Sequence, residues 1–155
     1  MIRPKKKRSF YMNRKNRTEI LVNSDLDFLQ ELSNLIRKNH KVKNIENPNK
    51  GLVMMKMRES AQKHLFYIGE ILVSECKVMI DNSMGLGILQ GNNLRKAYHL
   101  AVIDAAYNSN IKELEAINSL ISNKEKEIKK KNQMKVNKIL KTKVNFETLD
   151  EEIKA

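Results

Sequence analysis

The stretch from Gly51 to Tyr107 most constrains the fold of this chain of 155 residues. It begins with alternating apolar and polar residues, continues through about sixteen strand-like residues from Leu65 to Ile80, and ends in a segment that is apolar nearly all round. Period-two alternation is typical of a half-buried strand, whereas a helix without a polar face must be buried on more than one side. The sequence therefore predicts an antiparallel sheet covered by a buried helix.

Periodicity and end signals predict the other elements. Ser24 stands three residues before Asp27, which favours a helix start there, and leucines then recur at helical spacing. Asn47-Pro48-Asn49 predicts a turn, because proline and asparagine punctuate strands, and Asp81-Asn82-Ser83 predicts the turn of a hairpin. In chain order, we expect a helix over about 24–39, a short strand Lys41–Glu46, strands from Val53 to Arg58, from Leu65 to Ile80 and from Met84 to Gln90, a helix from Leu94 to about Asn108, and one or two helices over Lys112–Lys143.

Together these elements predict an α+β fold with an N-terminal helix, an antiparallel sheet of about four strands, a buried helix on the sheet and a long C-terminal helical segment. The length and the 41% hydrophobic content fit one folded unit. The predicted organisation is a basic N-terminal arm (1–17), an α+β core domain (18–110), a C-terminal helical segment (111–143) and an acidic tail (144–155).

The net charge of +12 is concentrated in two runs. Residues 1–17 hold eight Lys or Arg and no acid, and Lys124–Lys143 holds nine Lys against two Glu. Basic runs suggest a nucleic-acid-binding accessory protein as an alternative function. The aromatic residues argue against it, because Phe66 and Tyr67 are adjacent, point to opposite faces of a strand and make no stacking platform.

Cysteine and histidine usage predicts neither a metal site nor a bound cofactor in this chain. Cys76 is the single cysteine, so no intrachain disulfide can form, and the three histidines stand at no metal-ligand spacing. The position of Cys76 in the middle of a strand favours a buried, inert thiol. No run of about 18 apolar residues occurs and the basic N-terminus lacks a following apolar stretch, so we expect a cytoplasmic protein without a membrane partner.

Two places combine ionisable residues with a structural context. His64 precedes a strand, with Arg58, Glu59 and Glu70 near it in sequence, a grouping able to bind an anion or move a proton. A solvated loop histidine is the simpler interpretation. Asp104 lies inside the apolar helix and must find a hydrogen-bond or charge partner, which favours a structural role over a catalytic one. An independent enzyme built on His64 and Glu70 would lack a third group to orient the base.

The glycines have structural interpretations as well. Gly69 inside a strand predicts a bulge or a close backbone approach. Gly85-Leu86-Gly87 is not a dinucleotide fingerprint, because it falls inside a hairpin strand. The loop Gly91-Asn92-Asn93 precedes the buried helix and suits either an anion at the helix N-terminus or ordinary helix capping; both stay open. Taken alone, these residues indicate a binding or assembly subunit.

Six sequence blocks stand out by their order: the N-terminal NRTEILV, GLVMMKMRESAQ, HLFYIGEILVSECKV, GLGILQG, AYHLAVIDAAYN and the C-terminal NKILKTKVNFETLDEE. Together these blocks resemble the PhnG family, whose members are subunits of the bacterial carbon–phosphorus lyase system for phosphonates. The chain differs at Ser60-Ala61-Gln62-Lys63, where many members have a glycine-rich loop, and at Lys96, where a histidine is common.

The resemblance implies a core complex with PhnI, PhnH and PhnJ type subunits. In that complex methylphosphonate displaces adenine from ATP, the co-substrate, to give α-D-ribose 1-methylphosphonate 5-triphosphate, and the isolated chain is expected to be inactive. The candidates for a shared cleft are Arg58, Lys63, His64 and Glu70, because phosphate groups require cationic or amide donors. Residues expected in structural or interface roles are Phe66, Gly69, Gly85, Asp104, Val144 and Phe146.

Overall fold

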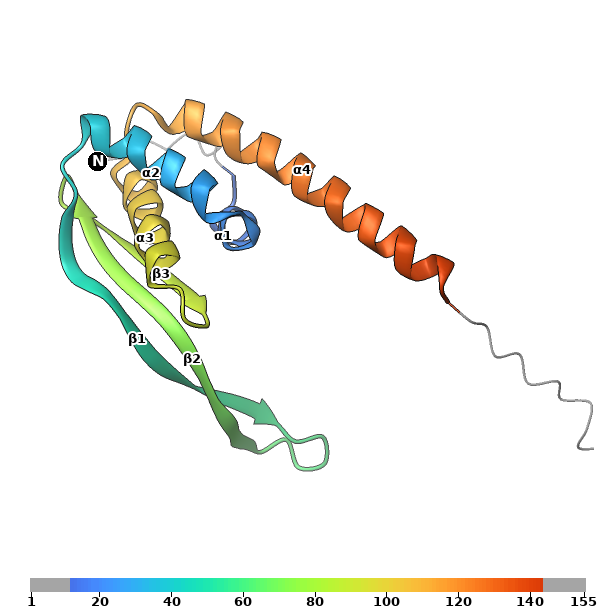
Figure 1. Cartoon of the computed structure of the whole chain (residues 1–155). Helices are drawn as coiled ribbons and strands as arrows, with labels where there is room; N and C mark the ends of the chain where they lie inside the picture. Colours follow the sequence, from blue (N-terminus) through green and yellow to red (C-terminus); the bar gives the residue numbers. More distant parts are fainter. Residues whose placement is uncertain (1–11, 144–155) are drawn as a thin grey trace, which may run out of the picture.

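A computed structural model describes residues 12–143 and has the predicted α+β architecture (Figure 1). Its elements are α1 (Arg14–Asn23), α2 (Leu26–Asn39), β1 (Lys43–Arg58), β2 (Leu65–Ile80), β3 (Ser83–Gln90), α3 (Leu94–Ser109) and α4 (Leu114–Lys141). The first eleven residues of the predicted basic arm lie outside the described residues. So does the predicted acidic tail, with Val144 and Phe146.

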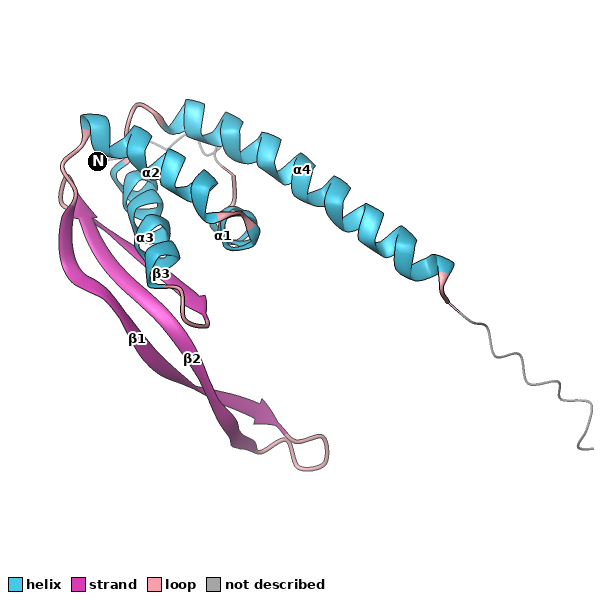
Figure 2. Ribbon diagram, viewed as in Figure 1, coloured by secondary structure: helices cyan, strands magenta, loops and turns pink. Residues whose placement is uncertain are grey.

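The sheet is antiparallel with the order β1-β2-β3 (Figure 2). Asp81 and Asn82 connect β2 to β3, and both have positive φ, 46° and 63°. Two-residue hairpin loops of this kind match the twist of the strands they join, and asparagine and aspartate tolerate the conformation. The predicted hairpin turn is therefore confirmed.

The sheet has three strands instead of the four that we predicted. The short strand at Lys41–Glu46 and the strand from Val53 to Arg58 are one continuous β1 that runs through Pro48. β1 is an edge strand, and its register with β2 shifts between Glu46 and Asn49. Because an edge strand with an irregularity does not need the missing proline N–H for its ladder, Pro48 ends no strand here.

The core surrounds α3 and contains buried residues of the sheet and of α1, α2 and α4 (Figure 1). Eight residues of α3 are buried, on several sides of the helix, because α3 packs against β2 and β3 on one side and against α2 on another. Gly85 and Gly87 permit this approach, since a Cβ on either would overlap backbone atoms of α3 at Ala97, Ala101 or Ala105. The apolar character of this helix thus has the predicted cause.

The sequence predicted three of the four described helices. α2 and α3 agree with the expected ranges, and the segment predicted as one or two C-terminal helices is the single 28-residue α4. α1 was not predicted, although Asn13 caps it by accepting from the Lys15 N–H at 3.2 Å. Its apolar residues, Ile20 to Val22, are consecutive and give no helical stripe.

Two segments extend beyond this body. β1 and β2 continue as a two-stranded hairpin past the end of β3, which pairs with β2 only from Val73 to Ile80. The second half of α4 also leaves the body, and every residue from Lys131 to Lys143 is exposed. In Figure 1 both segments leave the body toward the same side.

Candidate functional site

The hairpin of residues 51–72, here called the β1–β2 arm, exposes an unusual amount of apolar surface. Nine of its large apolar side chains are between 40% and 62% exposed, while Met55 and Ile71 are half-buried. The nine are Leu52, Val53, Met54, Met57, Leu65, Phe66, Tyr67, Ile68 and Leu72. Large contiguous apolar patches on a protein surface mark interaction sites. The arm is therefore the main candidate for a binding surface among the described residues.

The apolar residues occupy both faces of the arm. Leu52 pairs with Leu72, and the next pair, Val53 with Ile71, points to the opposite face because strand side chains alternate. A two-stranded hairpin is at best marginally stable in water unless something covers it. Both faces keep exposed apolar surface, since Leu52 is 62% and Val53 is 48% exposed, although Ile71 is half-buried.

The tip of the arm brings three of the predicted shared-cleft residues together. Arg58 Nη1 donates to the carbonyl of Lys63 at 3.1 Å, and the Glu59 N–H donates to the carbonyl of His64 at 3.1 Å. These bonds close the turn that holds Arg58, Lys63 and His64, and Lys63 has a positive φ of 57°. All three side chains are exposed. The tip thus presents the guanidinium of Arg58, the amine of Lys63 and the imidazole of His64 to solvent, with the half-buried Glu59 in the same turn.

Glu70, the fourth predicted residue, does not join this group. It pairs with Met54 on the shaft of the arm, and Leu65 is the last β2 residue in the ladder before the tip. Five residues of strand separate Glu70 from Leu65, or about 16 Å at 3.3 Å per residue. Glu70 therefore cannot orient His64, and the tip offers anion binding instead of a paired acid and base. Gly69 lies at the register shift opposite Met55 and Lys56, where we predicted a bulge.

Phe66, expected in an interface role, is 45% exposed on the shaft of the arm next to Tyr67. Tyr67 lies opposite Lys56, whose Nζ is 5.0 Å from the centroid of the tyrosine ring. This cation–π contact holds a basic group beside the exposed aromatic surface. The shaft therefore combines apolar and cationic groups, as the tip does.

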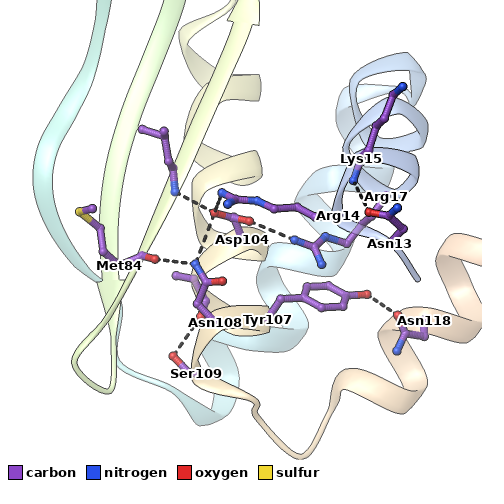
Figure 3. A network of polar contacts seen from close by, with 12 residues as sticks. Asn13, Arg14, Lys15, Arg17, Met84, Asp104, Tyr107, Asn108, Ser109 and Asn118 are labelled. Carbon is purple, nitrogen blue, oxygen red and sulfur yellow. Dashed lines mark hydrogen bonds and ion pairs between the residues drawn. The ribbon is translucent and has the colours of Figure 1, made fainter. Parts of the chain in front are cut away.

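Asp104 is the centre of a buried polar network between α1, α3 and β3 (Figure 3). Its carboxylate accepts from Arg14 at 2.7 Å, from Arg17 at 3.0 Å and from the Leu86 N–H at 3.2 Å. Asn108 also donates to it, at 3.5 Å, and to the carbonyl of Met84 at 2.7 Å. A carboxylate with this many donors is held as a structural anion.

Arg17 is the buried partner in this network. Its side chain is 7% exposed, whereas that of Arg14 is 62% exposed. The guanidinium of Arg17 stacks on the ring of Tyr107 at 3.7 Å, and the tyrosine hydroxyl donates to Asn118 on α4 at 2.5 Å (Figure 3). Burial lowers the pKa of Arg17, while Tyr107 and Asp104 act in the opposite direction. The network therefore fastens α1 and α4 to α3.

The sequence analysis missed Arg14 and Arg17 because both belong to the run that we assigned to a basic arm. The signal available was the need of Asp104 for a partner, which is general and identifies no residue. Lys96 was missed in the same way. Its Nζ donates to the carbonyls of Val22 at 2.5 Å and Ser24 at 2.8 Å, at the C-terminal end of α1. Burial lowers the pKa of this amine.

The loop before α3 is occupied by its own hydrogen bonds. Asn93 accepts from the Lys96 N–H at 3.1 Å, which is ordinary capping, and its own N–H donates to Ser74 Oγ at 2.8 Å. Ser74 in turn donates to the carbonyl of Gly91 at 2.7 Å. These contacts favour the capping interpretation of the loop over an anion site.

The single thiol lies in the core. Cys76 is 0% exposed, and burial raises the pKa of its thiol to about 11. Within residues 12–143, His, Cys, Asp and Glu side chains form no group of three that could hold a metal ion. In the same part of the chain, no helix has the length and apolar character needed to span a membrane.

Comparison with known proteins identifies the family of the chain. No curated protein gives a significant match. The family model described as "Phosphonate metabolism protein PhnG" matches residues 12–150, which include the whole arm, the Asp104 network and α4. A match over this share of the sequence establishes the family, and the chain belongs to the PhnG family of phosphonate metabolism proteins.

Proposed function

We propose that this chain is a non-autonomous subunit of a carbon–phosphorus lyase core complex. With PhnI, PhnH and PhnJ type subunits, it takes part in displacing adenine from ATP with methylphosphonate, giving α-D-ribose 1-methylphosphonate 5-triphosphate. Membership of the PhnG family supports the role in phosphonate metabolism. The reaction and the partners are the finer part of the proposal.

The β1–β2 arm is the observation that carries the proposal. Both of its faces carry exposed apolar side chains, and its tip holds Arg58, Lys63 and His64, none of which forms an ion pair among residues 12–143. Cationic groups bind the triphosphate and phosphonate oxygens of such substrates, but they do not by themselves make an acid–base centre. The arm therefore serves as an element that enters a cleft of a larger subunit and adds positive charge to it.

A reconstitution assay tests this function. The chain is co-expressed with the three partner subunits, and adenine release from ATP is measured with methylphosphonate present. We expect turnover by the assembly and none by the isolated chain. Adenine release by the chain alone contradicts the subunit role, and so does full activity of the partners without it.

A matched pair of variants tests the role of the tip. Lys63→Ala removes a charge at the tip, and Lys50→Ala removes an exposed charge near the base of the arm. We expect Lys63→Ala to lower kcat/KM for ATP about tenfold or more, since a hydrogen bond to a charged group contributes about 1.5–3 kcal/mol. Lys50→Ala should stay within about twofold of wild type. Equal effects of the two variants would remove the tip from the proposal.

Nucleic-acid binding is the second candidate, and one observation favours it. The segment Lys124–Lys143 of α4 and its end holds nine lysines against two glutamates. Binding of lysines to the phosphates of a nucleic acid weakens steeply as the salt concentration rises. Tight, salt-sensitive binding of single-stranded RNA by the chain within its assembly would favour this second function.

A further inference from the structure

The second half of α4 continues the apolar stripe that anchors the helix to the body. Ile117, Ile128 and Ile139 are spaced by eleven residues, which is close to three helical turns, so they lie along one line of α4. Ile117 is fully buried, Ile128 is partly buried and Ile139 is 68% exposed. The apolar stripe therefore continues along α4 beyond the part of the helix that packs against the body.

Three apolar residues make up the uncovered part of this stripe. Val136, Ile139 and Leu140 stand at positions i, i+3 and i+4, which places them on one face, and they are 47%, 68% and 57% exposed. Every residue from Lys131 to Lys143 is exposed. Helical segments in water depend mainly on packing of such a face for their stability.

The charges beside the stripe select the kind of partner. From Ile128 to Lys143 there are seven lysines and no acidic residue. Lys131, Lys135 and Lys138 are spaced by four and three residues and therefore flank the stripe on one side. Like charges at this spacing repel one another, and carboxylates on a partner would offset the repulsion.

We propose that this segment, Ile128–Lys143, is a docking helix for an acidic partner protein. It lays Val136, Ile139 and Leu140 into an apolar groove whose rim carries carboxylates that meet the lysines, as amphipathic helices do in helix-in-groove recognition. A second copy of the chain is disfavoured, because it would place lysines against lysines. The inference rests on the proposed function, in that the partner is sought among the subunits of the assembly.

The chain offers a matched control for the apolar contact. Ile139→Glu places a carboxylate in the stripe, and Met134→Glu makes the same change in charge five residues away, about 140° round the helix. Met134 is also exposed, at 52%. Neither change touches the body, since both side chains lie in the wholly exposed part of α4. Circular dichroism before and after heating checks that both variants keep the fold.

The experiment measures binding of the full chain to the co-expressed partner subunits by biolayer interferometry. We expect Ile139→Glu to weaken the dissociation constant tenfold or more and Met134→Glu to stay within about twofold. The triple variant K131Q/K135Q/K138Q should bind less tightly at about 50 mM salt and lose most of the wild-type weakening between about 50 and 300 mM.

Each other outcome overturns the inference. If Ile139→Glu binds the partners like wild type, the docking helix is wrong while the subunit role stands. If the wild-type chain joins no assembly, the proposed function is wrong and the inference is lost with it. Two further results identify a different occupant: a homodimer that Ile139→Glu abolishes, and tight binding of poly-uridine RNA that the triple lysine variant abolishes while Ile139→Glu does not.

Discussion

At the scale of single residues, the polar interior of this protein depends on one carboxylate. Asp104 accepts hydrogen bonds from two arginines of α1 and from the Leu86 N–H of β3. The side chain of Arg17 is almost completely buried, at 7% exposure. Removing the carboxylate charge would leave a buried guanidinium without its counterion, which is far more costly than losing a surface pair.

We therefore expect Asp104→Asn to lower the free energy of unfolding by about 3 kcal/mol or more. Arg14→Gln removes only the partner whose side chain is 62% exposed, so it should cost less than about 1 kcal/mol. Urea denaturation followed by circular dichroism measures both values. Similar losses in the two variants would mean that Asp104 is solvated and that the network does not fasten α1.

The buried thiol gives a second prediction at this scale. Burial raises the pKa of Cys76 to about 11, so at pH 8 about one thiol in a thousand is a thiolate, and none is exposed to a reagent. We expect no reaction of the native chain with Ellman's reagent at pH 8 and one thiol per chain in urea. A Ser119→Cys variant, which adds a thiol on the exposed side of α4, should react in the native state. Rapid labelling of native wild type contradicts the burial.

The raised thiol pKa also fixes the sign of a pH effect. The unfolded chain has the ordinary thiol pKa of 9.0, and the folded chain has the higher value. The protonated thiol is favoured in the folded state, so its contribution to stability is complete below pH 9 and is lost as the pH rises toward 11. The free energy of unfolding should therefore fall over this interval, more in wild type than in Cys76→Ala.

At the scale of elements, the contact between β3 and α3 determines the core. Gly85 and Gly87 place β3 against the backbone of α3, and a Cβ on Gly87 would overlap the carbonyl oxygen of Ala97. Rigid backbone on both sides cannot move apart without opening the core. A side chain at either glycine therefore separates the two elements.

We expect Gly87→Ala to lower the free energy of unfolding by about 1–3 kcal/mol, the usual cost of overpacking. Gly51→Ala is the matched control in β1, because the new methyl group would meet its nearest atom, on the Val73 side chain, at 3.6 Å, an ordinary contact. Thermal unfolding measures both. A stable Gly87→Ala chain with unchanged near-ultraviolet dichroism would show that α3 lies farther from β3.

The sequence predicted those elements whose signal is local and complete. The α2 leucines, the all-round apolar α3 and the Asp81-Asn82 turn each identify an element without help from the rest of the chain. The sequence analysis divided β1 at Pro48. A strand tolerates a proline only at the edge of a sheet, and the edge position of β1 is a property of the whole sheet. α1 was missed for a related reason, since its stability comes from contacts with α3 and α4.

The candidate site was predicted only in part for the same reason. A tight turn brings Arg58, Lys63 and His64 together, and their closeness in sequence was enough to group them. Glu70 was grouped with them as well, but strand geometry carries it away along the arm. The apolar faces of the arm are exposed because β1 and β2 are each 16 residues long, whereas β3 has only eight residues and ends before the arm begins.

At the scale of the whole molecule, the described chain divides into a packed body and two uncovered extensions. The body contains the fully buried residues of β2 and α3, among them Val78 and Ile103. The β1–β2 arm and the second half of α4 have few contacts that could resist local opening, because their side chains are exposed. Local stability should therefore fall from the body toward the tip of the β1–β2 arm and toward the C-terminal end of α4.

Amide hydrogen exchange of the isolated chain and of the reconstituted assembly tests this division. In the isolated chain, amides of Leu65–Leu72 should exchange much faster than those of Val73–Ile80, although both belong to β2, because β3 pairs only with the second half. In the assembly, the arm and the Lys131–Lys141 part of α4 should slow by about tenfold or more, as binding raises the cost of opening. Amides around Ile103 serve as the internal control and should change little. Equal protection along β2 in the isolated chain would mean that the arm is stable without a partner, and the exposed apolar surface would then need another explanation.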